Sequence, residues 1–129
     1  MSSGVDVTSL YELLYERRSL ASLRLRARAV EGAVAVAGGR ALVAAVRAGD
    51  FAATGAGPEE TEGVVDSLRG VDGVEVAALV KEQKNGARVR VSLRSKAFDV
   101  SALAALKGGG GHRLAAGFSS DDSPGEVIA

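Results

Sequence analysis

The sequence predicts an α/β protein: a single small domain with a mixed β-sheet flanked by helices. Segments with helical spacing of apolar residues alternate along the chain with short apolar strands, which is typical of this class. One pair of strands is separated by Asn85-Gly86, a dipeptide that favours a tight β-hairpin. The alternation continues from about Thr8 to Phe118 without an internal repeat, and 129 residues suffice for one buried core.

Composition and charge exclude several classes of protein. Sixteen basic and 16 acidic residues give a net charge of zero, so binding to nucleic acid would depend on a local patch. There is no cysteine, which excludes disulfides, thiolate metal sites and a cysteine nucleophile. No apolar run approaches the roughly 20 residues of a membrane span. The first residues, "MSSGVDVTS", lack a charged start and an apolar core. We therefore expect a cytoplasmic protein with no membrane contact.

Two helices are expected before the first strands. Ser9 and Glu12 have capping-box spacing, which predicts a helix that runs to about Arg18. A second helix follows, and we expect it to pack on the core through its leucine side. The residues of that side are Leu20, Leu23, Ala27 and Val30.

Two strand pairs are predicted. "AVAVA" (33–37) and "ALVAAV" (41–46) flank Gly38-Gly39-Arg40 and form two short strands joined by a tight turn. The hairpin around Asn85-Gly86 joins "VEVAALVKEQ" to "ARVRVSLRS". In its second strand, Val89, Val91 and Leu93 alternate with Arg88, Arg90, Ser92 and Arg94. One face is therefore apolar, and we interpret Arg88 and Arg90 on the other face as solvated.

Later segments predict more helices. Pro58 occupies a first helical position and Gly70 a stop, with Val64, Val65 and Leu68 on the apolar side. Asp99 caps a helix that runs through Leu106 and ends at Gly108. Its expected inward residues are Val100, Leu103 and Ala104. "HRLAAG" (112–117) is predicted to begin another short helix, and the tail from Ser119 is polar.

The candidate chemistry lies in two stretches. Residues 108–111 are four glycines followed by His112, the single histidine of the chain. Glycine N–H groups, with the start of a helix behind them, can surround phosphate oxygens, and His112 could donate to a phosphate or stack on a base. Spacing alone equally allows a tight connection with no ligand. Arg94 ends its strand within "SLRSK", beside the donors Ser95 and Lys96, and suits bidentate phosphate binding.

These motifs carry a resemblance to a known family. "VSLRSKAFDVSALAALKGGGGHRLAAGF" (91–118) resembles the accessory, substrate-binding domain of the DHH-family phosphoesterases. That family includes RecJ-like exonucleases and bacterial oligoribonucleases that also dephosphorylate adenosine 3',5'-bisphosphate (pAp). The order of "RVSLRSK", "DVS", "GGGGH" and "AAG" is most similar to the oligoribonuclease branch. A weaker similarity extends back through residues 61–82 and 10–30.

The resemblance implies residue roles and partners. Gly109, Gly110, Gly111 and His112 would hold a terminal phosphate or nucleotide, and Arg94 would contact the same phosphate, with Ser95 and Lys96 as weaker candidates. The bound molecules would be short single-stranded RNA or DNA oligonucleotides or nucleoside phosphates. In the family, a separate N-terminal domain with two metal ions, usually manganese, cleaves the bond.

The catalytic signature of that separate domain is absent from this chain. With one histidine and no Asp-His-His sequence, the chain cannot build the family's metal cluster alone, so we expect no catalytic residue, no cofactor and no hydrolysis here. The parent protein would be a manganese-dependent phosphoesterase. We expect residues 1–18 to be a linker and N-terminal helix from the preceding catalytic domain, and 19–129 to be the substrate-binding domain.

Three alternatives stay open. The accessory domain could serve a cyclic dinucleotide phosphodiesterase instead. The N-terminal leucine helices could form a dimer or interdomain surface, with a purely structural glycine loop. An enzyme reading would place a metal at Asp121 and Asp122, but these lie in a polar tail without a partner histidine.

Overall fold

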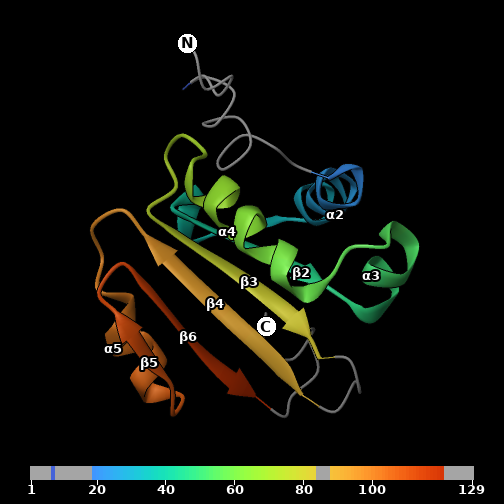
Figure 1. The fold of residues 1–129 in the computed structure, drawn as a ribbon. Coiled ribbons are helices and arrows are strands. Elements are labelled where there is room, and N and C mark those ends of the chain that lie inside the picture. Colours follow the sequence, from blue (N-terminus) through green and yellow to red (C-terminus); the bar gives the residue numbers. More distant parts are fainter. Residues whose placement is uncertain (1–6, 8–18, 84–87, 121–129) are drawn as a thin grey trace.

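A six-stranded mixed sheet forms the centre of the protein (Figure 1). The computed structural model describes residue 7 and residues 19–83 and 88–120. The strand order is β1-β2-β3-β4-β6-β5, and β2 and β3 are parallel while the other neighbours are antiparallel. The strands are β1 (Val34–Val36), β2 (Ala41–Val46), β3 (Val76–Glu82), β4 (Val89–Ser95), β5 (Gly110–His112) and β6 (Ala115–Ser120). The predicted α/β class with a mixed sheet is confirmed.

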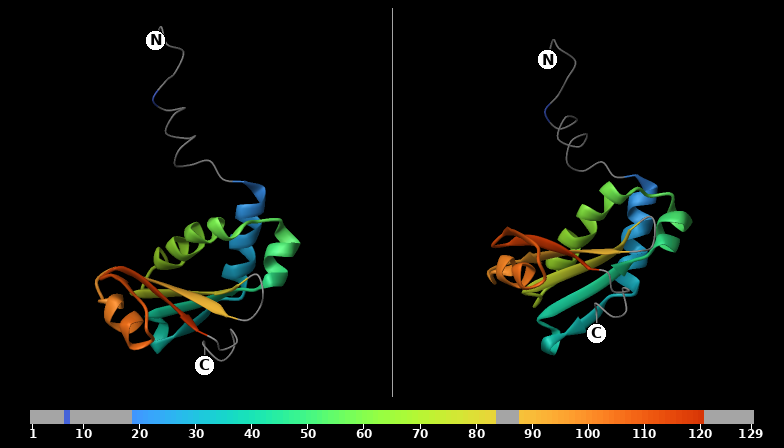
Figure 2. Two further views of the ribbon diagram at one scale, coloured as in Figure 1. Left: turned by 60° about the horizontal axis from the view of Figure 1, so that its bottom comes forward. Right: turned by 90° about the horizontal axis from the view of Figure 1, so that it is seen from below.

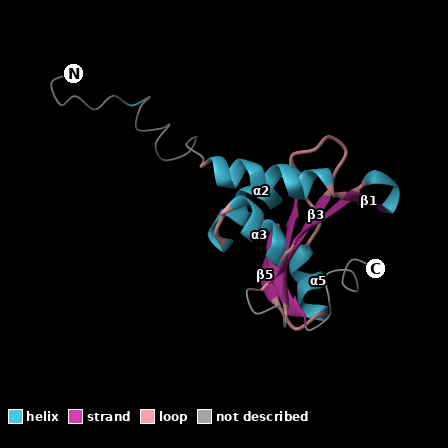
Figure 3. Ribbon diagram, turned by 90° about the vertical axis from the view of Figure 1, so that its right-hand side faces the viewer, coloured by secondary structure: helices cyan, strands magenta, loops and turns pink. Residues whose placement is uncertain are grey.

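Helices cover both faces of this sheet (Figures 2 and 3). One face carries α2 (Leu20–Glu31), α3 (Ala48–Thr54) and the 3-10 turn η3 (Pro58–Thr61) that leads into α4 (Glu62–Arg69). The opposite face carries α5 (Val100–Leu106), which packs on β4, β5 and β6. A second 3-10 turn, η2 (Ala37–Gly39), connects β1 and β2. Within the described ranges, no helix is both long enough and apolar enough to cross a membrane.

Each face of the sheet has its own apolar core, because successive strand residues point to opposite sides. On the α4 side, the core includes Leu25, Val64, Val65, Leu68 and Leu79. On the α5 side, it includes Val89, Val91, Val100, Ala104 and Phe118. Most of the predicted elements are confirmed: the strands on either side of Gly38-Gly39, the helix after Pro58 with its buried valines and leucine, and the helix capped by Asp99.

The predicted packing side of α2 is wrong. Its buried residues are Ser22, Leu25 and Ala29, whereas Leu20, Leu23 and Val30 are 60%, 45% and 49% exposed. The small side chains of Ser22 and Ala29 let the helix approach its neighbours closely, and Leu25 is the large side chain of this helix that is fully buried. Apolar spacing defines a stripe on this helix but not which stripe faces the sheet.

Three further expectations differ from the structure or lie outside it. Leu103 of α5, predicted to point inward, is 40% exposed, because the short helix buries only Val100 and Ala104. "HRLAAG" is not a helix: it forms the end of β5, a turn and the start of β6. The helix expected between Ser9 and Arg18, the turn at Asn85-Gly86 and the acidic pair Asp121 and Asp122 lie outside the described residues.

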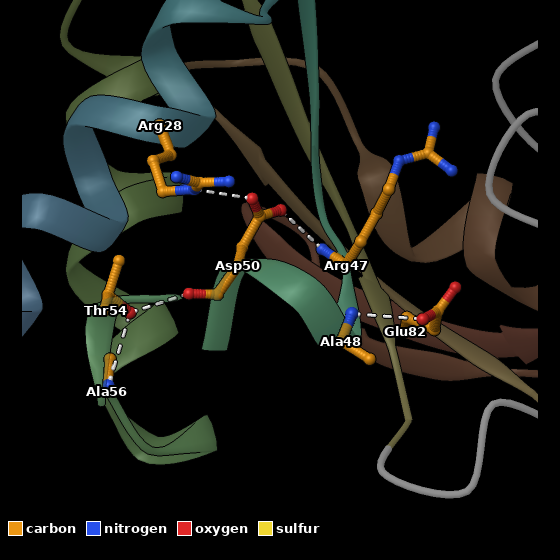
Figure 4. Close-up of polar contacts among 7 residues, drawn as sticks. All are labelled: Arg28, Arg47, Ala48, Asp50, Thr54, Ala56 and Glu82. Carbon is orange, nitrogen blue, oxygen red and sulfur yellow. Dashed lines mark hydrogen bonds and ion pairs between the residues drawn. The ribbon is translucent and has the colours of Figure 1, made fainter. Parts of the chain in front are cut away.

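Helix α3 was not predicted, and a single carboxylate organises its start (Figure 4). Asp50 Oδ2 accepts a hydrogen bond from Arg47 N–H at 2.8 Å, and Asp50 Oδ1 accepts one from Arg28 Nε of α2 at 2.7 Å. Burial of Asp50 by itself would raise the pKa of its carboxyl. The hydrogen bonds from Arg47 and Arg28, together with the positive charges of these two residues, outweigh burial and lower that pKa.

We expect Asp50 to stabilise the fold at neutral pH and to lose this effect in acid. A carboxyl with a lower pKa in the folded state contributes stability above its unfolded pKa, near 4, and loses it as the pH falls through the folded value. Asp50→Asn should lower the free energy of unfolding by about 1 kcal/mol at pH 7. The difference from the parent chain in urea denaturation should shrink below about pH 4. Asp72→Asn, at an exposed loop position, is the control, and a loss that does not depend on pH would contradict the assignment.

The packing of α2 gives a second prediction. Leu25→Ala should cost about 2–5 kcal/mol, because it empties a site that is 0% exposed. Leu23→Ala on the same helix should cost less than about 1 kcal/mol, because its side chain already contacts solvent. Equal losses for the two variants in chemical denaturation would show that the leucine side packs after all.

Candidate anion-binding site

The register of β4 between its two neighbours brings a polar row together on the α4 face. Arg90 lies opposite Lys81 of β3 and Ser119 of β6. Ser92 lies opposite Leu79 and Gly117, and Arg94 opposite Ala77 and Ala115. Residues directly opposite one another share a face of the sheet, so Arg90, Ser92 and Arg94 of β4 all point to the α4 side.

A hollow of about 270 Å³ lies over this row. Helix α4 contacts β3 and β4, and in β5 and β6 the hollow is bordered by residues with small or no side chains. The lining residues from those two strands are Gly110, Gly111, Ala115, Ala116 and Gly117. The remaining lining residues are Glu62, Lys81, Arg90, Ser92 and Arg94. We call this space the cation hollow, because three of its side chains are cationic.

Arg94 is held in place by helix α4. Its Nη2 is 2.8 Å from Glu62 Oε2, its Nε is 3.6 Å from Asp66 Oδ1, and its Nη1 donates to the Leu93 carbonyl at 3.0 Å. The Arg94 side chain is 15% exposed, whereas that of Glu62 is 67% exposed. The guanidinium is therefore a fixed group that already has a carboxylate partner at the rim of the hollow.

The surroundings of Lys81, a half-buried residue, disfavour its charged form. Burial lowers the pKa of its ammonium group, the positive charges of Arg90 and Arg94 lower it further, and Glu62 opposes this effect. Three cations gathered at a partly buried place repel one another, and an anion among them would relieve this repulsion. Against the two carboxylates that contact Arg94, Glu62 and Asp66, the three cations leave an excess of one positive charge, which suits an anion.

The backbone and the packing require glycine at three of the four positions 108–111, for a different reason at each. Gly108 follows α5 with φ +80°, a conformation that L side chains rarely adopt. A Cβ on Gly109 would overlap the Gly117 carbonyl oxygen of β6. Gly111 has φ +143°, and its Cβ would lie 2.6 Å from Ala116 Cα. A Cβ on Gly110 would meet nothing within 4 Å. Gly110, whose position borders the hollow, is thus the one glycine of the run that neither packing nor backbone conformation requires.

The predicted site residues are only partly gathered here. Arg94, Gly110 and Gly111 line the cation hollow, and Gly109 packs against β6 behind it. His112 is exposed, and its pairing with Ala115 places it on the same face as Arg94, two strand spacings or roughly 10 Å away. Because residues 110–112 are a strand, the helix start expected behind the glycines is absent from this position.

The structure does not bring Ser95 and Lys96 to the hollow. Ser95 is 1% exposed, lies on the opposite face from Arg94, and its Oγ accepts a hydrogen bond from Ala97 N–H at 3.2 Å. Lys96 follows the end of β4, and its Nζ donates to the Val71 carbonyl at 3.3 Å. Because successive residues of a strand point to opposite faces of the sheet, Arg94 and Ser95 lie on different faces although they are neighbours in "SLRSK".

Two residues of the hollow were missed from the sequence. Arg90 was interpreted as solvated, yet it lines the hollow, and its Nη1 lies 3.4 Å from Ser119 Oγ. Lys81 was not singled out. The sequence did contain a signal for Arg90: it lies four residues from Arg94 on one strand, so the two side chains share a face of the sheet. The contribution of Lys81 depends on the hairpin register.

The described part of the chain offers no metal site. No three His, Cys, Asp or Glu side chains there lie close enough together to hold an ion. The manganese implied by the family therefore has no ligand set among these residues, and we assign no step through a metal to them.

Comparison with known families identifies the domain. A family model described as the DHHA1 domain matches residues 38–128. The chain belongs to the DHHA1 domain family. The resemblance to an accessory domain of the DHH family is confirmed at this level. The matched range lies within the predicted domain of residues 19–129.

Solved structures share the fold of this DHHA1 domain. A crystal structure of an exopolyphosphatase-related protein from Bacteroides fragilis matches with a TM-score of 0.86 and 22% identity, over 98% of this chain and 37% of that one. A pGpG-specific phosphodiesterase from Vibrio cholerae matches with a TM-score of 0.58 and 11% identity, over 95% of this chain and 40% of that one. This chain thus spans less than half the length of either protein.

The differences among the glycines can be tested by alanine substitution. Gly109→Ala and Gly111→Ala should each lower the free energy of unfolding by about 1–3 kcal/mol. At both positions the added methyl group would clash with the backbone of β6, and at Gly111 the φ of +143° is also unfavourable for alanine. Gly110→Ala should unfold at nearly the same denaturant concentration as the parent chain. A large loss for Gly110→Ala would show that this position too is fixed by packing.

Proposed function

We propose that this DHHA1 domain holds a phosphate group of a short oligoribonucleotide, or of a nucleoside bisphosphate such as pAp, in the cation hollow. The observation that carries the proposal is the placement of Lys81, Arg90 and Arg94 around a strip of sheet without side chains at Gly110 and Gly117. Guanidinium groups bind phosphate through paired N–H donors. The Arg90 guanidinium lies over Gly117, and the open position at Gly110 leaves room for the phosphate oxygens.

The role of each residue follows from its position. Arg94, fixed by α4, would orient the phosphate. Lys81 would neutralise its charge from the β3 side and Arg90 from the β6 side, where its Nη1 lies 3.4 Å from Ser119 Oγ. Gly110 would leave space for the bound group, and His112, exposed on the same face, would contact the neighbouring part of the ligand. Cleavage would belong to a separate metal-bearing DHH domain. The phosphate held here would fix the distance between the bound end and the scissile bond.

The branch of the family is part of the proposal. The order of "RVSLRSK", "DVS" and "GGGGH" supports oligoribonucleotides and pAp as ligands. The pGpG-specific phosphodiesterase among the structural neighbours supports a second candidate, a dinucleotide held through the same phosphate site. Titration with pAp, the linear dinucleotide pGpG and a cyclic dinucleotide would separate them, because a cyclic ligand has no terminal phosphate.

Charge substitutions test the site directly. Arg94→Ala should weaken pAp binding by roughly 10- to 100-fold, which corresponds to a loss of about 1.5–3 kcal/mol for a hydrogen bond to a charged group. Glu62→Gln should strengthen binding, because it removes the carboxylate that competes for Arg94. Arg40→Ala is the matched control, since Arg40 pairs with Glu75 at the start of β2 and does not line the hollow.

Calorimetric titration at two salt concentrations would measure these effects. Binding should weaken as the salt concentration rises, because phosphate contacts release counterions. Unchanged affinity in Arg94→Ala together with no gain in Glu62→Gln would refute the assignment of the cation hollow to phosphate.

A further inference from the structure

A second and larger cavity lies beside the cation hollow. It has a volume of about 790 Å³, within the range of small-molecule sites, and is bordered by α3, the residues that lead into η3, and the end of β3. Its apolar wall includes Ala48, Phe51, Ala52 and Pro58, and its polar wall includes Lys81 and Glu82. All of these residues belong to the described part of the chain. We call it the α3 cavity.

Lys81 lines both the α3 cavity and the cation hollow. The same side chain therefore forms part of the boundary between a mostly apolar space and a cationic one. A second link between the two spaces is the segment from η3 into α4. Pro58, at the start of η3, lines the α3 cavity, and Glu62, at the start of α4, borders the cation hollow. A ligand with one anionic and one apolar end could occupy the two spaces at once.

The walls of the α3 cavity suit a flat aromatic ring. Phe51 is the phenylalanine that contributes to it, while Phe118 belongs to the core on the α5 side and Phe98 is exposed just before α5. A base can stack on such a ring, and stacking tolerates any nucleobase. Alanine and proline side chains around it leave the space open and apolar.

Glu82 adds a fixed acceptor to this wall. One of its carboxylate oxygens, Oε1, accepts a hydrogen bond from the Ala48 N–H at the start of α3, at 3.0 Å (Figure 4). The carboxylate is thereby held at the edge of the cavity by backbone. A carboxylate accepts from N–H groups, which nucleobases carry on their ring and exocyclic nitrogens.

We propose that the α3 cavity is a subsite for the nucleobase of a nucleotide whose phosphate lies in the cation hollow, with Lys81 between the two. This inference rests on the proposed function, because it takes the hollow as the phosphate site. It assigns base binding to α3, η3 and the end of β3, away from the glycine run. Phe51 would stack on the base, and Glu82 would accept from one of its N–H groups.

The test compares ligands that differ only in the base. Inorganic phosphate, ribose 5-phosphate and AMP are titrated into the chain, with binding followed by NMR. AMP should bind at least fivefold more tightly than ribose 5-phosphate and should shift the ring resonances of Phe51. If AMP binds no more tightly than ribose 5-phosphate, the proposal is wrong.

A pair of variants on one helix makes the test specific. Ala52 and Ala53 are both exposed residues of α3, and of the two only Ala52 lines the cavity. Ala52→Leu should therefore project a larger apolar side chain into the cavity without disturbing the core, weaken AMP binding at least fivefold and leave ribose 5-phosphate binding unchanged. Ala53→Leu should change neither affinity. Equal effects of the two variants on AMP would overturn the assignment.

The two proposals fail in different ways. If phosphate and ribose 5-phosphate bind, and Arg90→Ala weakens both, but the base adds no affinity, then the base subsite fails and the phosphate site stands. If Arg90→Ala and Arg94→Ala leave the binding of every ligand unchanged, the phosphate site fails, and the base subsite fails with it.

Discussion

The pairing of β4 with β3 on one side and β6 on the other is the constraint on which the site depends. It fixes Arg90, Ser92 and Arg94 on one face and the valines of the strand on the other, where α5 covers them. A shift of one residue in this register would bury three polar residues beneath α5 and expose the apolar core. The large free-energy cost of that exchange keeps the cations where they are. The site therefore inherits its precision from the core rather than from contacts among its own residues.

The ion pair between Arg94 and Glu62 connects this row to the helices. Glu62 is the first residue of α4, and α4 packs its valines and leucine into the core beside α2. Arg94 is thus braced by a rigid helix, which reduces the side-chain entropy that a ligand would otherwise have to remove. The same carboxylate competes with any incoming anion. The pair therefore fixes the position of the Arg94 guanidinium, and under the proposed function it would oppose phosphate binding.

The sequence predicts the elements better than it predicts how they meet. Alternation in "RVRVSLR" was enough to place Arg90 and Arg94 on one face, and Pro58 and Asp99 marked the starts of their helices correctly. The side of α2 that packs could not be predicted, because Leu20, Leu23 and Leu25 are equally apolar and only the neighbouring elements choose among them. Lys81 entered the site through pairing between strands, which is a long-range contact. "HRLAAG" became a hairpin because tertiary pairing with β4 outweighed the helical preference of leucine and alanine.

The glycine run also acts as a spacer of fixed length. The end of α5 needs a left-handed residue at 108, β6 leaves no room for a side chain at 109, and the hairpin needs an unusual backbone at 111. With three glycines, Lys107 would have to take the left-handed position, whereas with five the strand would slip by one residue and turn His112 to the α5 face. Insertions and deletions in this run should therefore be harder to accommodate than substitutions at Gly110. The number of glycines, and not only their flexibility, connects α5 to the face of the sheet where the cations lie.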